Sequence, residues 1–156
     1  MAAIVVDGSE EMREREEQNL LQLSASSRIM AAAVSDYRPS AALAAKRPKD
    51  AAAWTVELEP TTDVLATLGE RRHPGQLLVG FAADRGAEGL ERARRKLTGK
   101  GADLFVFNDV ARSDIGFDSA DNEVTLIAAG GERTIAKTSK EEIAAGVLDE
   151  VERLLG

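Results

Sequence analysis

One strand–helix–strand pattern constrains the fold more than any other feature of the sequence. Residues 77–83 (LLVGFAA) and 102–107 (ADLFVF) are apolar runs with the length of a buried strand. Residues 86–98 between them place apolar side chains on one helix face, and Gly99 and Gly101 follow where that helix should end. Such a unit joins two parallel strands by a right-handed crossover. The sequence therefore predicts an α/β fold with a Rossmann-like, mostly parallel sheet and flanking helices.

The segments before this unit add strands and one more helix. Residues 28–34 (RIMAAAV) predict a buried strand that ends in a polar turn, and Ile4–Val6 predicts a short one. Residues 54–58 alternate apolar and polar side chains, which is typical of a half-buried strand. A helix should then begin, capped by Thr61 or Thr62. Because only one short strand is predicted before the strand at 28–34, we expect the sheet to be truncated at its N-terminus.

The C-terminal third predicts a hairpin followed by a helix. Two short strand-like runs flank Gly130-Gly131, which is a strong hairpin signal. Ser139 and Glu142 have the spacing of a capping box, and apolar residues then recur at helical spacing. We therefore expect a β-hairpin extension of the sheet and an amphipathic C-terminal helix.

Composition excludes several classes of function. The chain has no cysteine, which excludes a disulfide scaffold, a thiolate zinc site and a cysteine nucleophile. His73 is the only histidine, and we expect it to be exposed and inert. Tyr37 and Trp54 should be packing residues. The net charge of -7, the 4% aromatic content and the lack of a long apolar run disfavour nucleic acid and membrane partners. We expect a cytoplasmic protein with a small-molecule ligand.

Polar residues follow the predicted parallel strands. Ligands of open α/β sheets bind beyond the carboxyl ends of such strands. The candidates at those ends are Ser35, Asp36, residues 81–84, Asn108 and Asp109. Asp36 is placed either to bind a ribose hydroxyl or a cation, or to cap the following turn. The helix start at Thr62-Asp63 adds free backbone N–H groups suited to an anion.

Two basic clusters, residues 46–49 (KRPK) and 92–100 (RARRKLTGK), occur in this acidic chain and suggest an anionic ligand. Lys96 and Lys100 are four residues apart and so share one helix face, which suits a phosphate clamp. Lysines near a helix C-terminus also interact favourably with the helix dipole, so a purely structural role remains an alternative. Lys46 lies in a predicted loop, where simple solvation is the alternative.

Six ordered segments carry a resemblance to one family. They are MAAAVSDYRP (30–39), KRPK (46–49), EPTTDVLATL (59–68), LVGFAAD (78–84), ARRKLTGKGADLFVFNDV (93–110) and IGFDSADNEVTLI (115–127). Together they resemble the CTP-dependent phosphopantothenate–cysteine ligases, which in bacteria usually form the C-terminal half of a fused coenzyme A biosynthesis protein. The resemblance begins near residue 28 and runs to the end of the chain.

The resemblance implies a Rossmann-like fold and a two-step ligation. The carboxylate of 4'-phosphopantothenate attacks the α-phosphate of CTP to give an acyl-cytidylate and pyrophosphate, and the amine of cysteine then displaces CMP. Mg2+ and cationic side chains would neutralise the charges that meet. The resemblance also implies a homodimer, to which the apolar residues Ile115, Phe117 and Leu126 would contribute. A flavin-dependent decarboxylase is the expected further partner, and no flavin is expected in this chain.

Carried over position by position, the resemblance assigns CTP contacts to Met30, Ala31, Ala32, Asp36, Lys46, Thr62, Asp63, Val64, Leu65, Phe81, Lys96 and Lys100. Lys46 is also assigned to turnover of the acyl-cytidylate and is therefore the catalytic candidate. Phe81 would line the base or ribose pocket, and the two lysines of the second basic cluster would bind phosphates. No metal ligand is assigned.

One part of the family pattern is missing. The glycine-rich strand and turn that begin the ligase domain have no counterpart in this sequence, so we expect residues 1–156 to form a single, partial ligase domain. A non-catalytic CTP-binding or dimerisation module left by truncation is the alternative. An unrelated Rossmann oxidoreductase is disfavoured, because no GxGxxG fingerprint is present.

Overall fold

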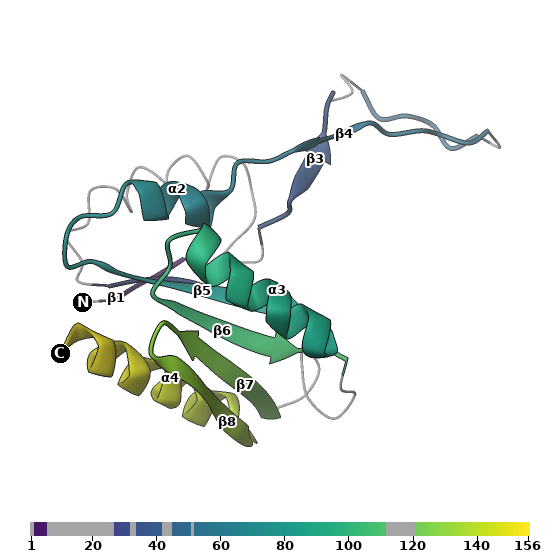
Figure 1. Ribbon diagram of the computed structural model, residues 1–156. Helices are drawn as coiled ribbons and strands as arrows, with labels where there is room; N and C mark the ends of the chain where they lie inside the picture. Colours follow the sequence, from purple (N-terminus) through teal and green to yellow (C-terminus); the bar gives the residue numbers. More distant parts are fainter. Residues whose placement is uncertain (1, 6–26, 32–33, 42–44, 51, 112–120) are drawn as a thin grey trace.

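The computed structural model describes residues 2–5, 27–31, 34–41, 45–50, 52–111 and 121–156 (Figure 1). Within these residues one sheet has six strands, and its spatial order is β1-β2-β5-β6-β7-β8. The strands are β1 (Ala2–Val5), β2 (Ser27–Met30), β5 (Leu77–Asp84), β6 (Leu104–Asp109), β7 (Asp121–Ala128) and β8 (Gly131–Ser139). The first four run parallel, and β7 and β8 continue the sheet antiparallel. The predicted Rossmann-like, mostly parallel sheet with a hairpin extension is confirmed.

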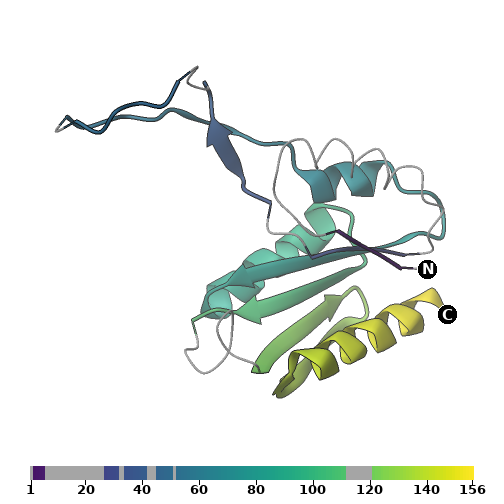
Figure 2. The ribbon, with the colours of Figure 1, turned by 180° about the vertical axis from the view of Figure 1, so that it is seen from behind.

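Helices cover both faces of this sheet (Figures 1 and 2). The described helices are α2 (Val64–Glu70), α3 (Gly86–Gly99) and α4 (Lys140–Leu155). Side chains alternate along β6, so that Phe105 and Phe107 pack with α2 and α3, whereas Leu104 and Val106 pack with α4. Strands buried on both faces read as continuous apolar runs, which is why these segments were predictable.

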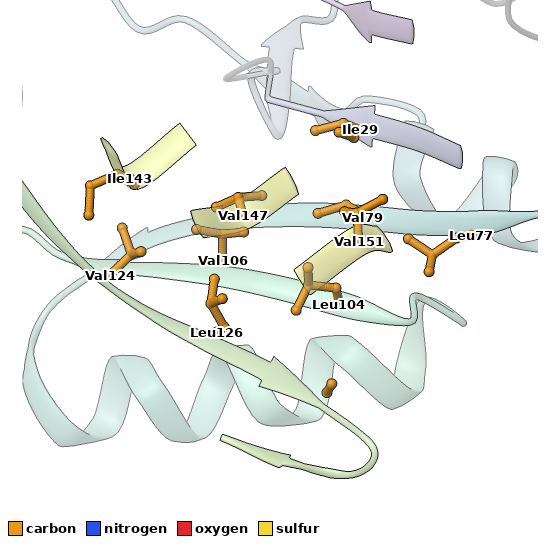
Figure 3. Close-up of a cluster of buried hydrophobic side chains, with 11 residues drawn as sticks. Ile29, Leu77, Val79, Leu104, Val106, Val124, Leu126, Ile143, Val147 and Val151 are labelled. Carbon is orange, nitrogen blue, oxygen red and sulfur yellow. The ribbon is translucent and has the colours of Figure 1, made fainter. Parts of the chain in front are cut away.

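The core beneath α4 is made of aliphatic side chains (Figure 3). Ile143, Val147 and Val151 form the buried stripe of α4 and pack against Val79 and Val106 of the sheet. The helix begins as predicted, with the Ser139 hydroxyl accepting from the Glu142 amide at 3.3 Å. In a complete capping box the Glu142 carboxylate would accept from the Ser139 amide. It accepts a hydrogen bond from the Thr138 hydroxyl instead.

A two-stranded extension projects from the domain (Figures 1 and 2). It pairs β3 (Tyr37–Pro39) with β4 (Leu58–Pro60) in antiparallel fashion. The prediction of a half-buried strand over residues 54–58 is wrong. Trp54 and Val56 are exposed, because no described element covers the extension. The prediction that Tyr37 and Trp54 are packing residues is also wrong, because their exposed fractions are 60% and 55%.

Other boundaries differ from the prediction more modestly. The strand predicted over 28–34 ends at Met30, because the chain leaves the sheet at the carboxyl end of β2, and Ala31 is exposed. The short N-terminal strand is confirmed as β1. Ile115 and Phe117 lie outside the described residues. In the part of the chain that the structure describes, no helix is long and apolar enough to span a membrane.

Candidate functional site

A cavity of about 290 Å3 lies at the carboxyl ends of β2 and β5, between α2 and α3. It is lined by most of the residues that the sequence assigned to CTP, namely Met30, Asp36, Thr62, Asp63, Val64, Leu65, Phe81, Lys96 and Lys100. The topology explains this convergence, because parallel strands end at one edge and the following helices begin or end beside it.

Two of the predicted residues that the structure describes do not line this cavity. Ala31 is exposed and does not line it. Lys46 is exposed in the connection between β3 and β4, within the extension, and does not line the cavity either. Ala32 lies outside the described residues.

The cavity also contains residues that were not predicted to contact the ligand, namely Val34, Thr61, Ala82, Ala83 and Phe105. Phe105 is 1% exposed, and its ring lies against the backbone of β5. It forms the apolar floor of the cavity. A Cβ on Gly80 would stand 2.8 Å from the Phe105 Cζ and 2.6 Å from the Leu65 Cδ2. Glycine at this position therefore lets α2 sit directly on the sheet beside the cavity.

The segment that leads into α2 is fixed by hydrogen bonds to the other wall of the cavity. The Thr61 amide donates to the Asp36 carbonyl at 2.9 Å, and the Thr61 hydroxyl donates to the Ser35 carbonyl. Neither Thr61 nor Thr62 caps the helix, which corrects the prediction. Asp63 does so, because its carboxylate accepts from the Ala66 amide at 3.0 Å. Thr61, Thr62 and Asp63 all suit a helix cap. The hydrogen bonds of Thr61 to residues distant in sequence leave Asp63 as the residue that caps α2.

Lys96 and Lys100 lie at the end of α3 and both line the cavity, as predicted from their spacing. The Lys100 Nζ lies 3.1 Å from the Asp63 Oδ2 and so joins α3 to α2. Burial alone would raise the pKa of Asp63. The Ala66 amide, the Lys100 ammonium and the charge of Lys96 outweigh that effect and lower this pKa below its ordinary value.

Asp84 and Asp109, which were candidates at the strand ends, have structural partners. Arg92 donates two hydrogen bonds to the Asp84 carboxylate, at 2.7 and 2.8 Å. These bonds, with one from the Arg85 amide, hold the pKa of Asp84 well below its usual range. The Asp109 carboxylate accepts from the Gly86 amide at 2.9 Å and satisfies the start of α3. Neither carboxylate lines the cavity.

The charged lining of the cavity consists of Asp36, Asp63, Lys96 and Lys100. Within the described residues, Asp63 and Lys100 form an ion pair, whereas the side chains of Asp36 and Lys96 have no ion-pair partner. The uncharged lining consists of Thr61 and Thr62 and of apolar residues such as Met30 and Phe81. This arrangement suits a ligand with an anionic group for Lys96, hydroxyl or cationic groups for Asp36 and an apolar part.

The donor set also limits how a metal ion would be held. Among the described residues, no group of three or more His, Asp or Glu side chains is arranged to hold a metal ion. Mg2+ is usually bound by only one or two carboxylates together with substrate phosphates and waters. Asp36 therefore fits a Mg2+ ion that is carried mainly by a triphosphate.

A second cavity, of about 530 Å3, lies at the amino end of β5 beside the end of α4. Its lining includes Arg72 and Asp103, which pair with each other at 2.6 Å, together with His73 and Leu154. Although it is larger, it lies at the wrong end of the strands for a ligand site in this class of sheet. We therefore take the smaller cavity as the candidate site.

The chain is similar to known proteins along nearly its whole length. Residues 1–155 match the family model described as the DNA/pantothenate metabolism flavoprotein C-terminal domain. The chain is 38% identical over 128 residues to the coenzyme A biosynthesis bifunctional protein CoaBC of Bacillus subtilis (strain 168), covering 81% of this chain and 31% of that protein. It is 34% identical over 155 residues to CoaBC of Thermococcus kodakarensis, covering 97% of this chain and 37% of that protein. The chain thus spans about a third of the length of these relatives.

Solved structures agree with the sequence matches. The C-terminal domain of a CoaBC protein superposes with a TM-score of 0.72 at 29% identity, covering 97% of this chain and 74% of that one. A Cab2 variant in complex with phosphopantothenate-cysteine gives a TM-score of 0.64 at 16% identity, covering 88% of this chain and 48% of that one, and shares the fold.

Proposed function

The chain belongs to the DNA/pantothenate metabolism flavoprotein C-terminal domain family, and from this premise we propose that it acts in coenzyme A biosynthesis as a CTP-dependent phosphopantothenate–cysteine ligase domain. The observation that carries the proposal is one cavity in which most of the residues assigned to CTP come together from β2, α2, β5 and α3. Its relatives named CoaBC and the neighbour bound to phosphopantothenate-cysteine support the same substrate class.

The proposed reaction has two steps. A carboxylate oxygen of 4'-phosphopantothenate attacks the α-phosphorus of CTP, the bond to pyrophosphate breaks, and an acyl-cytidylate forms. The amine of cysteine then attacks the acyl carbon, CMP leaves, and the amine loses a proton as the amide forms. A carboxylate and a triphosphate repel each other, so the cavity must supply positive charge where they meet.

The residues of the cavity have distinct proposed roles. The Lys96 ammonium would contact the phosphates, and Asp36 would contact a ribose hydroxyl or help to hold Mg2+. Mg2+ would spread the negative charge of the triphosphate. Phe81, at the cavity edge, would pack on the base or the ribose. Val64, Leu65 and the floor residue Phe105 would keep water from the apolar side of the nucleotide.

Selective binding of CTP over ATP tests the proposal. Backbone groups at Met30 and Thr62–Leu65 would read the edge of a pyrimidine beside Phe81, so the larger purine should fit poorly. We expect calorimetry in the presence of Mg2+ to give CTP an affinity at least about tenfold above that of ATP. Equal affinity for the two nucleotides would contradict selective recognition of CTP, and binding of neither would contradict nucleotide recognition at this site.

Lys46 should affect turnover more than binding. It lies outside the cavity, in a segment that would have to approach a bound nucleotide before its ammonium could stabilise developing charge. We expect Lys46→Ala to leave CTP affinity nearly unchanged and to slow consumption of the acyl-cytidylate in single-turnover kinetics. Unchanged kinetics would instead assign Lys46 to solvation. Lys49→Ala, three residues further along the same basic cluster, is the matched control.

A non-catalytic CTP-binding module is the second candidate function. One observation favours it: the residue assigned to turnover, Lys46, lies outside the cavity that gathers the binding residues. CTP binding without release of pyrophosphate, with all three substrates present, would select this alternative.

The proposal extends to partners. A homodimer and a decarboxylase partner follow from the family resemblance. Leu126 is buried against α4 and is therefore not available for self-association, which corrects that part of the prediction. Among the described residues, the extension offers the exposed apolar side chains Tyr37, Trp54, Val56 and Leu58 instead.

A further inference from the structure

We infer that Asp63 is an internal counter-anion: it positions the Lys100 ammonium, limits the charge that Lys100 can give to a ligand, and leaves Lys96 as the principal phosphate contact. The inference rests on the proposed function, because it concerns how the same cavity distributes its positive charge. It departs from the expectation that the two lysines act as equivalent halves of a clamp.

Both carboxylate oxygens of Asp63 already have partners. Oδ1 accepts from the Ala66 amide at 3.0 Å and caps α2, and Oδ2 lies 3.1 Å from the Lys100 Nζ. The cap fixes the side-chain torsions of Asp63, so the second oxygen is held in place for the ammonium. A phosphate that approaches Lys100 must therefore compete with a carboxylate that is already oriented.

Lys100 is also held through its backbone. A Cβ on Gly69 would stand 2.2 Å from the Lys100 carbonyl oxygen, so the end of α3 lies directly against the last turn of α2. The Lys100 amide in turn donates to the Lys96 carbonyl at 3.0 Å. The Lys100 backbone thus packs closely on α2 and its ammonium pairs with the α2 N-cap Asp63, which is the arrangement of a structural cation.

Lys96 differs from Lys100 in every one of these respects. Among the described residues it forms no ion pair, and its side chain is exposed at the cavity. Its charge acts on Asp63 and Asp84 from a distance. Each of these carboxylates has a closer cationic partner, Lys100 for Asp63 and Arg92 for Asp84. Lys96 is therefore the lysine of the cavity whose ammonium is not paired with a carboxylate among the described residues.

Asp63→Asn separates the two roles of Asp63. Asparagine caps a helix about as well as aspartate, so α2 keeps its N-cap while Lys100 loses its counter-anion. We expect calorimetry at low salt to show CTP binding roughly two- to fivefold tighter in this variant, because Lys100 is released to the phosphates. Added salt should reduce the gain. The gain should vanish in Asp63→Asn combined with Lys100→Ala.

The lysine variants complete the test. Lys96→Ala should weaken CTP binding about ten- to a hundredfold and leave cytidine binding unchanged, because cytidine has no phosphate. Lys100→Ala should weaken CTP binding less than about threefold and lower the melting temperature instead. Equal losses of CTP affinity in the two lysine variants, or weaker CTP binding in Asp63→Asn, would overturn the inference.

Inorganic pyrophosphate separates this inference from the proposed function. If the unchanged chain binds CTP no more tightly than pyrophosphate, nucleotide recognition is wrong, and the same variants titrated with pyrophosphate still decide whether Lys96 and Lys100 differ. If neither CTP nor pyrophosphate binds, both the proposed function and the inference fail.

Discussion

Replacing Phe105 with alanine is expected to cost about 3–5 kcal/mol of folding free energy and to abolish nucleotide binding. The ring is 1% exposed, packs in the core beneath α2 and α3, and forms the floor of the candidate site. Its loss leaves a void under Leu65 that the rigid sheet cannot close. A domain of this size loses roughly 2–4 °C of melting temperature per kcal/mol, so the melting temperature should fall by about 6–20 °C.

Val106→Ala is the matched control, because the neighbouring side chain on β6 is equally buried but packs against α4 on the opposite face. This variant should also lower the melting temperature, by less because fewer atoms are removed. It should keep its CTP affinity at temperatures where it is folded. If Phe105→Ala bound CTP as well as Val106→Ala does, Phe105 would not be part of the site.

Gly69→Ala should be the second most damaging substitution. A methyl group at this position would stand 2.2 Å from the Lys100 carbonyl oxygen, and a backbone atom cannot move aside as a flexible side chain can. We expect α2 and the end of α3 to separate, at a cost of roughly 1–3 kcal/mol measured by denaturant unfolding. The ion pair between Asp63 and Lys100 should weaken, and CTP affinity should change with it.

Gly99→Ala controls for the intrinsic effect of alanine in a helix. It lies in the last turn of α3, where an added Cβ meets nothing within 4 Å. Alanine there should be neutral or stabilising by up to about 1 kcal/mol. If Gly69→Ala were as well tolerated as Gly99→Ala, the close contact between α2 and α3 would not exist in solution.

The sequence predicted the central sheet, and most of the residues that it made candidates line one cavity, for physical reasons. Parallel strands are buried on both faces, so 77–83 and 102–107 read as apolar runs and correspond to β5 and β6. Strands of this kind end at one edge, which places Asp36 and Phe81 at the same cavity. The helical spacing of Lys96 and Lys100 predicted that they share one helix face, and the family resemblance assigned them to the ligand; both line the cavity.

Features that depend on contacts distant in sequence were not predictable. Residues 61–63 are all good helix caps, and only the hydrogen bonds of Thr61 to the segment before β3 leave the cap to Asp63. The alternation around Trp54 suggested burial, but a pattern cannot report that no other element covers the strand. The pairing of Asp63 with Lys100 required knowing how α2 and α3 meet.

The central claim is that the cavity between α2 and α3, rather than the larger cavity at the other end of the sheet, binds CTP. Backbone amide chemical shifts measured by NMR during titration with CTP and Mg2+ test this most directly. The account predicts that the largest shifts fall at Thr62–Leu65, Phe81 and Lys96–Lys100, with those at His73, Asp103 and Leu154 unchanged. Shifts concentrated at His73, Asp103 and Leu154, or no large shifts at either set of residues, would contradict this claim.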